Sequence, residues 1–240
     1  MKTRLDRLLV DRGLAESREK AQALIMAGEV LLNGQKAAKP GQPVADDAAV
    51  EVLARPPFVG RGGLKLAAAL RHFSIDAAGK TCLDIGSSTG GFTDAMLQSG
   101  ARRVHAVDVG AGQLDWSLRT DARVSLHEGL NARELKPEDI GEPVDLLTCD
   151  VSFISVTLIL PAAVPLLRPA GQMVILIKPQ FEVGKGQVGK GGIVRDPQLH
   201  QAACQRVSGA VRELGFETDI MDSPILGAEG NKEFLLYAHH

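Results

Sequence analysis

The sequence predicts an α/β protein, a doubly wound and mostly parallel sheet preceded by a small α+β unit. From residue 61 onward, short apolar runs with strand character alternate with helical stretches, as in sheets whose strands are joined by crossover helices. Residues 1–54 instead show two short helical patterns followed by strands and turns. The Pro-rich residues 55–58 separate the two patterns and favour extended chain. We therefore expect domains at residues 1–54 and 61–240, joined by a linker at 55–60.

The elements of the first unit are predicted from helix ends and one turn. Residues 5–12 form an amphipathic helical pattern that Gly13 ends, and Ser17 can cap a second helix that continues to residue 27. The Asn33-Gly34 pair after a short apolar run is typical of a tight hairpin turn. A last strand is expected near residues 50–53.

The second unit is predicted to hold a seven-stranded sheet. Apolar or alternating runs indicate strands at residues 81–85, 104–107, 124–127, 144–149, 173–178, 217–222 and 233–238. Helices are expected at residues 64–73, 91–98, 114–119, 154–167 and 197–214. Because no helix separates the last two strands, they should form an antiparallel hairpin at the edge of the sheet.

The composition is that of a chain that folds around an apolar core. Apolar residues make up 45% of the chain and charged residues 23%, which argues against a disordered protein. The net charge of −2 argues against a generic polyanion binder. The charge is uneven, however, because residues 1–65 hold 11 Lys and Arg against 8 Asp and Glu. Residues 1–65 are therefore slightly basic and residues 66–240 acidic.

Several protein classes are not indicated. Three cysteines are too few for a disulfide framework or a zinc finger, and Cys82 and Cys149 are expected to be buried free thiols of a cytoplasmic protein. The six histidines show no metal-ligand spacing, so no metal is expected. The first residues lack a signal-peptide pattern, and Pro161 and Pro165 break the longest apolar stretch. No membrane span is expected.

A glycine-rich turn between the first strand of the sheet and its helix is the main candidate for a ligand site. Glycines let a ligand approach the backbone, and a helix N-terminus offers free amides. Asp84 precedes the turn, where a carboxylate suits a cationic group, and Asp108 ends the next strand, where an acid binds ribose hydroxyls. This combination resembles an S-adenosylmethionine site, and the alternative is a tight turn with Asp84 as a helix cap. The candidate cofactor residues are Asp84, Gly86, Ser87, Ser88, Thr89, Gly90, Gly91, Phe92, Asp108, Asn131 and Asp150.

A second glycine-rich stretch, residues 184–190, matches the phosphate loop of nucleoside triphosphatases only in part. Gly191 follows Lys190 where that loop has Ser or Thr, so the hydroxyl that binds magnesium is missing. A flexible cationic loop explains the stretch better. It is either a solvated connection or a contact to RNA phosphate through Lys185, Lys190 and Arg195.

Two charged residues follow predicted strands of the sheet. Asp150 comes directly after residues 144–149, and Lys178 comes after five apolar residues. Burial favours the neutral, basic form of a lysine, whereas a nearby carboxylate favours the cation. Such a pair can position and tune a proton acceptor. The alternative is a structural ion pair.

Three segments resemble a known family. Residues 84–94, 149–154 and 177–182 resemble the RrmJ/FtsJ-type RNA 2′-O-methyltransferases, and the whole chain resembles their TlyA subgroup, some of whose members are named haemolysin A. The resemblance implies a Rossmann-like class I methyltransferase fold behind an S4-like RNA-binding domain, with S-adenosylmethionine as the cofactor. It also implies a catalytic tetrad of Lys65, Asp150, Lys178 and Glu233. Glu182 and Glu229 compete for the last place, and Glu233 is preferred because it begins the last strand.

The resemblance further implies a reaction and a partner. Lys178 would help to deprotonate a ribose 2′-hydroxyl that attacks the sulfonium methyl in line, while Asp150 orients Lys178. The substrate would be ribosomal RNA or a ribosomal subunit, with cytidine ribose as the target. The basic residues expected to contact RNA are Arg4, Arg7, Arg12, Arg18, Lys20 and Lys36 in the first unit, and Lys185 and Lys190 in the second. Acids lie among these cations, so an ordinary solvated surface is the alternative.

Two other functions compete with this interpretation. One is a non-catalytic RNA-binding or ribosome-assembly protein, and the complete glycine turn with four candidate charges argues against it. The other is a haemolysin or pore former, which needs a membrane-spanning or exposed amphipathic segment that the sequence does not show. The oligomeric state is not predicted.

Overall fold

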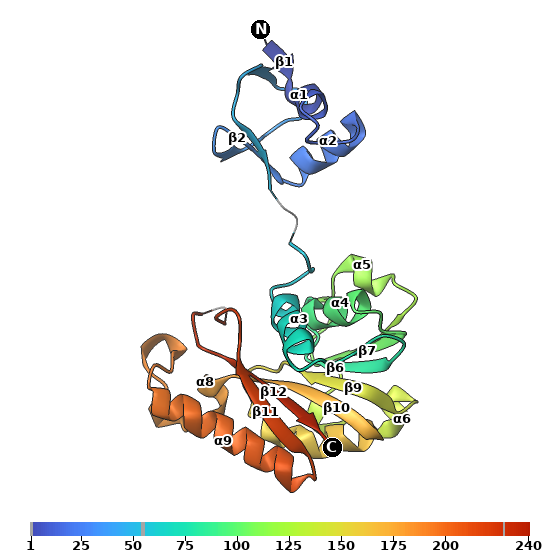
Figure 1. Cartoon of the computed structure of the whole chain (residues 1–240), viewed down its shortest axis with the longest axis vertical. Helices are drawn as coiled ribbons and strands as arrows, with labels where there is room; N and C mark the ends of the chain where they lie inside the picture. Colours follow the sequence, from blue (N-terminus) through green and yellow to red (C-terminus); the bar gives the residue numbers. More distant parts are fainter. Residues whose placement is uncertain (1, 54–55, 228) are drawn as a thin grey trace. The chain divides into compact units, whose positions relative to one another are not determined.

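The computed structural model describes residues 2–53, 56–227 and 229–240, without the side chain of Lys185. Contacts divide the chain into two units, Met1–Pro56 and Pro57–His240, which Figure 1 shows in sequence colours. The division falls within the expected linker at residues 55–60, and residue 55 itself lies outside the described residues. Each unit has its own apolar core.

The first unit packs two helices against short strands. Its elements are β1 (Lys2–Arg4), α1 (Leu5–Asp11), α2 (Arg18–Met26), β2 (Val30–Leu32), β3 (Gln35–Lys36), β4 (Pro43–Ala45) and β5 (Val50–Val52). Ser17 caps α2, as predicted, by accepting a hydrogen bond from the backbone N–H of Lys20. Asn33 and Gly34 both have positive φ and join β2 to β3 in the predicted hairpin. The sequence pattern does not predict the pairing of β1 with β4, because three-residue strands carry too little periodicity.

A seven-stranded sheet forms the centre of the second unit, as predicted (Figure 1). Its strand order is β11-β12-β10-β9-β6-β7-β8. Strands β10, β9, β6, β7 and β8 are parallel, whereas β12 runs antiparallel to β10 and β11, which gives the expected edge hairpin. The bounds are β6 (Thr81–Ile85), β7 (Arg103–Asp108), β8 (Val124–Glu128), β9 (Val144–Cys149), β10 (Leu167–Ile177), β11 (Glu217–Asp222) and β12 (Phe234–His239).

Helices cover both faces of this sheet. They are α3 (Gly62–His72), α4 (Gly91–Gln98), α5 (Trp116–Arg119), α6 (Pro137–Ile140), α7 (Leu160–Ala163), α8 (Pro179–Glu182) and α9 (Pro197–Glu213). Successive strand residues enter opposite cores: Cys82 packs with residues of α3 and α4, and Leu83 packs with residues of α7 and α9. This alternation is what a sheet buried on both faces requires.

The helix expected at residues 154–167 is not continuous, which corrects that prediction. The segment forms short 3₁₀ turns at Val156–Leu158 and Val164–Leu166 on either side of the four-residue α7. Pro161 and Pro165 each lie in the first turn of one of these pieces, the place where proline fits a helix. The prolines therefore divide the apolar run into separate turns.

The parallel strands determine where a site can form. The carboxyl ends of β6, β7, β9 and β10 meet at one edge of the sheet, because these strands run in one direction. The segments that follow these strands include the glycine turn, Asp150 and Lys178. Residues far apart in the sequence therefore meet at this edge.

Two histidines in contact on neighbouring strands make the second unit sensitive to acid. His105 on β7 is buried, with its Nδ1 3.2 Å from His127 Nε2 on β8 and its Nε2 3.4 Å from Glu142 Oε1. Burial lowers the pKa of both histidines below the ordinary value. As the pH falls below about 6.5, the unfolded chain therefore takes up protons first, and unfolding becomes more favourable.

We expect His105→Gln to reduce the loss of thermal stability between about pH 7.5 and about pH 5.5, because glutamine does not titrate. Each kcal/mol of this difference corresponds to about 2–4 °C in Tm for a protein of this size. Calorimetry of both proteins at both pH values measures it. The comparison with wild type isolates the effect of His105. The pKa of Asp84 is raised to about 6, so protonation of Asp84 stabilises the folded state as the pH falls and partly offsets the loss from the histidines. Equal losses in the two proteins would contradict this prediction.

Candidate active site

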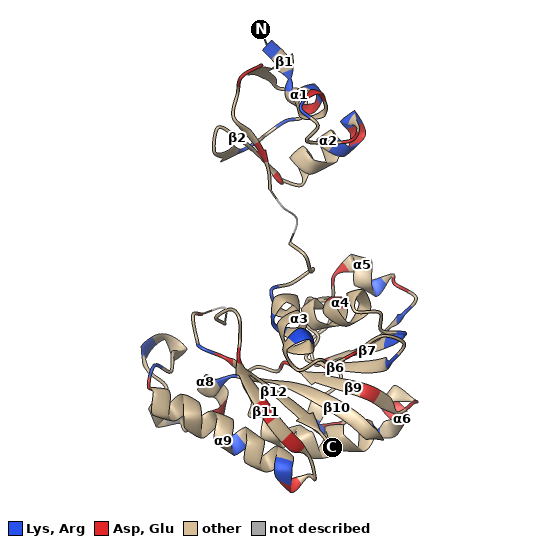
Figure 2. Ribbon diagram, in the orientation of Figure 1, with Lys and Arg blue, Asp and Glu red and all other residues tan. Residues whose placement is uncertain are grey.

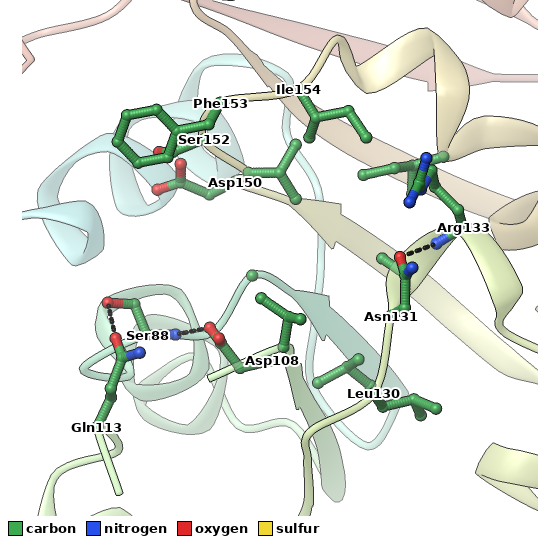
Figure 3. A pocket seen from close by; sticks show the side chains of 16 residues that line it. Ser88, Asp108, Gln113, Leu130, Asn131, Arg133, Asp150, Ser152, Phe153 and Ile154 are labelled. Carbon is green, nitrogen blue, oxygen red and sulfur yellow. Dashed lines mark hydrogen bonds between the residues drawn. The ribbon is translucent and has the colours of Figure 1, made fainter. Parts of the chain in front are cut away.

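A cavity of about 510 Å³ opens at the carboxyl edge of the sheet (Figure 3). Its volume lies in the range of sites that bury small ligands. The polar residues that line it are Ser88, Asp108, Gln113, Asn131, Arg133, Asp150 and Ser152. Gly86, Val107, Leu130, Val151, Phe153 and Ile154 supply much of the remaining wall.

The predicted glycine turn brings the backbone close to this cavity. Gly86 has φ +83°, and an added Cβ would stand 2.3 Å from the carbonyl oxygen of Asp150. Gly90 has φ +98°, and a Cβ there would stand 2.2 Å from Leu118 Cδ1. Both positions therefore require glycine. The ends of β6 and β9 meet at this point without side chains between them.

Asp108 faces the cavity, as expected. Its carboxylate accepts hydrogen bonds from the backbone N–H groups of Ser88 at 2.8 Å and Gly110 at 2.7 Å. These bonds hold the acid at the end of β7, the position where such sheets bind ribose hydroxyls. Ser88 Oγ also donates to Gln113 Oε1 at 3.3 Å, so Gln113 joins the wall (Figure 3). The sequence analysis did not select Gln113, which lies in an irregular loop.

Asp84 does not line the cavity, which corrects the expectation that its carboxylate lies at the strand end. Its side chain is fully buried and accepts hydrogen bonds from Thr93 Oγ1 at 2.7 Å and Thr148 Oγ1 at 3.0 Å. Burial raises the pKa of Asp84 to about 6. Asp84 precedes the last residue of β6, so its side chain enters the layer beneath α4 instead of leaving the strand end. It ties α4 and β9 to β6 and thereby holds the turn.

Five other candidate cofactor residues also lie outside the cavity wall. They are Ser87, Thr89, Gly90, Gly91 and Phe92. Gly91 packs so closely that an added Cβ would stand 2.9 Å from the backbone nitrogen of Gly63. Phe92 is buried, and a Cβ at Gly62 would stand 3.2 Å from its ring. Gly91 and Phe92 thus pack the start of α4 against the start of α3, which carries Lys65.

Asn131 lines the cavity, but its amide already has protein partners. Its Oδ1 accepts from the backbone N–H of Arg133 at 3.2 Å (Figure 3). Its Nδ2 donates to Glu134 Oε1 at 3.3 Å. Asn131 thus caps the 3₁₀ turn at Ala132–Glu134. Arg133, which the sequence analysis did not select, lines the cavity beside it.

The four residues of the predicted tetrad form two ion pairs. Lys178 Nζ lies 2.6 Å from Asp150 Oδ1 at an angle outside hydrogen-bond geometry, and it donates to Ser152 Oγ at 2.9 Å. Lys65 Nζ donates to Glu233 Oε2 at 2.5 Å, and the two side chains are only 9% and 3% exposed. The carboxylate of Asp150 also faces the first turn of α3, the helix that carries Lys65, because a Cβ on Gly62 would stand 3.9 Å from Asp150 Oδ2.

A second cavity, of about 320 Å³, lies next to the first. The residues that line it are Ser152, Phe153, Lys178, Gln180, Phe181, Val188, Gly192, Glu229 and Glu233. Ser152 and Phe153 line both cavities. The first cavity is therefore lined by Gly86, Ser88 and Asp108, the second is lined by Lys178 and Glu233, and the two share a wall.

The alternatives to Glu233 occupy different places. Glu182 is buried and accepts from Ser155 Oγ at 2.6 Å and from the backbone N–H of Val156 at 2.8 Å. Its carboxylate holds the turn that precedes α7. Glu229 lines the second cavity, but it does not share the ion pair of Lys65 with Glu233.

Phe153 lines both cavities, although no role is predicted for it within the family-like segment 149–154. Its side chain is 91% exposed, and its φ is +66°, an uncommon conformation for a bulky residue. Strained backbone of this kind is concentrated at functional sites. The sequence gives no signal for a positive φ at a phenylalanine, although its place three residues after Asp150 could have drawn attention to it.

The predicted RNA-contacting residues of the first unit are exposed, and acids lie among them (Figure 2). Arg4 and Arg18 both bind Asp6, whose side chain is fully buried. The Arg4 guanidinium holds the pKa of Asp6 well below its ordinary value. Arg4 and Arg18 are each 52% exposed, so they connect β1 to α2 and still reach solvent.

The other predicted contacts divide into paired and unpaired cations. The paired ones are Arg7 with Asp11, Arg12 with the carbonyl oxygens of Asp46 and Ala48, and Lys20 with Glu16. Lys36 is exposed and has no ion-pair partner among the described residues. In the second unit, Lys190 is exposed in a 3₁₀ turn, and the side chain of Lys185 lies outside the described part.

We expect Gly86→Ala to weaken cofactor binding at least about 10-fold and to lower Tm, because the new Cβ would push Asp150 and the end of β9 away from the turn. Gly79→Ala is the matched control, since Gly79 has φ +70° but open space around an added Cβ. Gly79→Ala should lose thermal stability because alanine is strained at positive φ, but it should bind the cofactor with wild-type affinity. Calorimetric titration with S-adenosylhomocysteine measures both. Equal affinity in the two variants would show that close approach at Gly86 is unimportant.

Comparisons with known proteins agree with this geometry. The family model of FtsJ-like methyltransferases matches residues 58–240, and that of the S4 domain matches residues 3–50. The 16S/23S rRNA (cytidine-2′-O)-methyltransferase TlyA of Mycobacterium tuberculosis is 48% identical over 239 residues, which cover 98% of this chain and 89% of that protein. The 23S rRNA (cytidine-2′-O)-methyltransferase TlyA of Campylobacter jejuni is 37% identical over 248 residues, which cover 95% and 96%.

Other relatives extend the comparison. Hemolysin A of Brachyspira hyodysenteriae is 42% identical over 236 residues, 98% of each chain. Within the described residues, no helix has both the length and the apolar character that crossing a membrane requires. A solved structure from Streptococcus thermophilus is 43% identical with a TM-score of 0.76, and it covers 99% of this chain and 88% of its own.

A more distant structure shares the fold. Fibrillarin of Aeropyrum pernix, solved with S-adenosyl-L-methionine, has a TM-score of 0.51 at 23% identity over 72% of this chain and 74% of its own. The alignment with the Mycobacterium protein covers 98% of this chain and so includes the residues of the S4 match. With the two matched domains in this order and 48% identity across nearly the whole chain, the protein belongs to the TlyA group of FtsJ-like methyltransferases.

Proposed function

We propose that this protein methylates the ribose 2′-hydroxyl of cytidine in ribosomal RNA, with S-adenosylmethionine as the methyl donor. The observation that carries the proposal is the pair of ion pairs, Lys178 with Asp150 and Lys65 with Glu233, beside two cavities that share a wall. Such a wall suits a reaction between two bound molecules. The relatives from Mycobacterium and Campylobacter are named for this activity.

The first cavity fits S-adenosylmethionine. Gly86 contributes only backbone to the cavity wall, and Asp108 offers fixed acceptors for ribose hydroxyls. Asp150 adds negative charge to the wall that a cationic ligand would face. When bound, S-adenosylmethionine supplies a methyl group on a positively charged sulfur. We assign Gly86, Ser88, Asp108, Asn131 and Asp150 to this ligand, and we assign Asp84 to the support of the turn.

The residues of the second cavity act on the hydroxyl. Lys178 Nζ, when uncharged, accepts the proton of the 2′-hydroxyl, and Asp150 holds that nitrogen in place. Lys65 and Glu233 fix the charges around the oxygen and align it. Placement of the reacting groups can supply about 7–11 kcal/mol of the barrier reduction. Proton transfer adds about 10²–10⁴-fold.

The first unit supplies an RNA contact. The S4 match covers residues 3–50, and residues 1–54 hold eight Lys and Arg against eight Asp and Glu. Arg7, Lys20 and Lys36 are exposed and can meet phosphates of a structured RNA. We propose that this domain, followed by a linker at residues 55–60, directs the catalytic domain to ribosomal RNA in the cytoplasm.

Mapping of 2′-O-methyl groups tests the function. Ribosomal RNA from a strain that lacks the gene is compared with RNA from wild type and from the deletion strain complemented with Lys178→Ala. We expect a cytidine methyl group that is present in wild type and absent in the other two. An identical methylation pattern in all three strains would instead support a non-catalytic RNA-binding role.

A further inference from the structure

The second cavity contains a polar group that the methyl transfer does not use. Gln180 lines this cavity close to Lys178 in the sequence. Its Oε1 atom is buried and has no hydrogen-bond donor among the residues that the structure describes. Buried amide oxygens nearly always have a partner. A hydrogen-bond donor on the bound substrate would supply the missing partner of Gln180 Oε1.

Glu229 brings a carboxylate to the same cavity. Asn231 is almost fully buried, donates to Gly192 O at 2.9 Å and accepts from the backbone N–H of Val194 at 3.0 Å. These bonds tie the glycine-rich loop to the turn that carries Glu229, and a Cβ on Gly192 would stand 3.3 Å from Glu229 Oε2. Among the described side chains, Glu229 has no cationic partner. Its charge is therefore available to a ligand.

The other walls of this cavity suit a flat ring. Phe153 and Phe181 line it, with ring centroids 5.3 Å apart. Since Lys178 lines the same cavity, a nucleoside whose 2′-hydroxyl meets Lys178 would have its base nearby. The edge of that base would come within reach of Gln180 and Glu229.

The two polar groups differ in what they can recognise. An amide has both a donor and an acceptor, so by rotating it can pair with cytosine or with uracil. A carboxylate can only accept. It favours the N4 amino group of cytosine and disfavours the O4 oxygen of uracil. Discrimination between these bases thus depends on the carboxylate, which attracts one and repels the other.

We propose that Gln180 binds the edge of the target base and that Glu229 makes the site select cytosine over uracil. The inference rests on the proposed ribose methylation and adds to it the group that chooses the base. It concerns two residues of the second cavity that take no part in the Lys65–Glu233 pair.

The test compares cytidine and uridine at the mapped target position of an otherwise identical ribosomal RNA transcript. Methylated nucleosides are measured by mass spectrometry for wild type, Glu229→Gln and Gln180→Leu. We expect wild type to prefer cytidine about 10- to 100-fold. Glu229→Gln should lose most of this preference, mainly by gaining activity on uridine, because its amide can donate to O4. Gln180→Leu should lower kcat/KM about 10-fold on both RNAs.

Glu138→Gln is the matched control, because it makes the same change at an exposed position of α6 and should keep the wild-type preference. Glu229→Ser removes the charge with a smaller side chain and should reduce the preference as well. If both Glu229 variants are active and keep the wild-type preference, the proposal is overturned. If wild type methylates neither transcript nor native ribosomal RNA, the proposed function fails, and base selection fails with it.

Discussion

Replacing Lys178 with alanine should lower kcat for RNA methylation by about 10²–10⁴-fold. The reason is that Lys178 Nζ is the nitrogen that Asp150 holds beside the second cavity, where it can accept the hydroxyl proton. Affinity for S-adenosylmethionine should change less than about twofold, since Lys178 is not part of the first cavity wall. Single-turnover methylation of ribosomal RNA and calorimetric titration of the cofactor measure the two effects.

Lys178→Arg separates charge from proton transfer. Arginine can still pair with Asp150, but its guanidinium does not give up a proton in proteins. We expect this variant to fold normally, to bind the cofactor and to be nearly as slow as Lys178→Ala. A rate above about one tenth of wild type would mean that Lys178 acts as a fixed charge instead of a proton acceptor. A comparable rate in Lys178→Ala itself would remove Lys178 from the catalytic set.

The fold could be predicted because its information is local and repeated. Each buried strand of the sheet shows an apolar run, and glycines or caps mark many helix ends. The prediction was wrong where apolar character and proline conflicted, at residues 154–167. Apolar composition suggested one helix there, but Pro161 and Pro165 permit only first-turn positions.

The site was predictable to the extent that it depends on strand ends. Asp108, Asp150 and Lys178 follow strands of one parallel sheet, so their convergence follows from topology. The direction in which a single side chain points does not follow from topology. Asp84 is only one residue from the end of β6, yet the alternation of strand residues buries it under α4. The positive φ of Phe153 likewise depends on contacts that the sequence pattern does not encode.

The ion pair of Lys65 with Glu233 joins α3 to the start of β12 across 168 positions of sequence. We expect Glu233→Leu to lower the free energy of unfolding by about 3–5 kcal/mol, because it leaves the Lys65 ammonium buried without its partner. Urea unfolding followed by far-UV circular dichroism measures the change. The same variant should lose methylation, since it removes one member of the proposed tetrad.

The double variant Lys65→Met/Glu233→Leu distinguishes the structural part of this loss from the catalytic part. Replacing both charges with apolar groups of similar size removes the unpaired ammonium, so most of the stability should return, as it does for other buried pairs. Methylation should stay at the level of the single variant, because stability alone does not restore the charges that align the hydroxyl. If activity returned together with stability, Lys65 and Glu233 would serve only to hold α3 against β12.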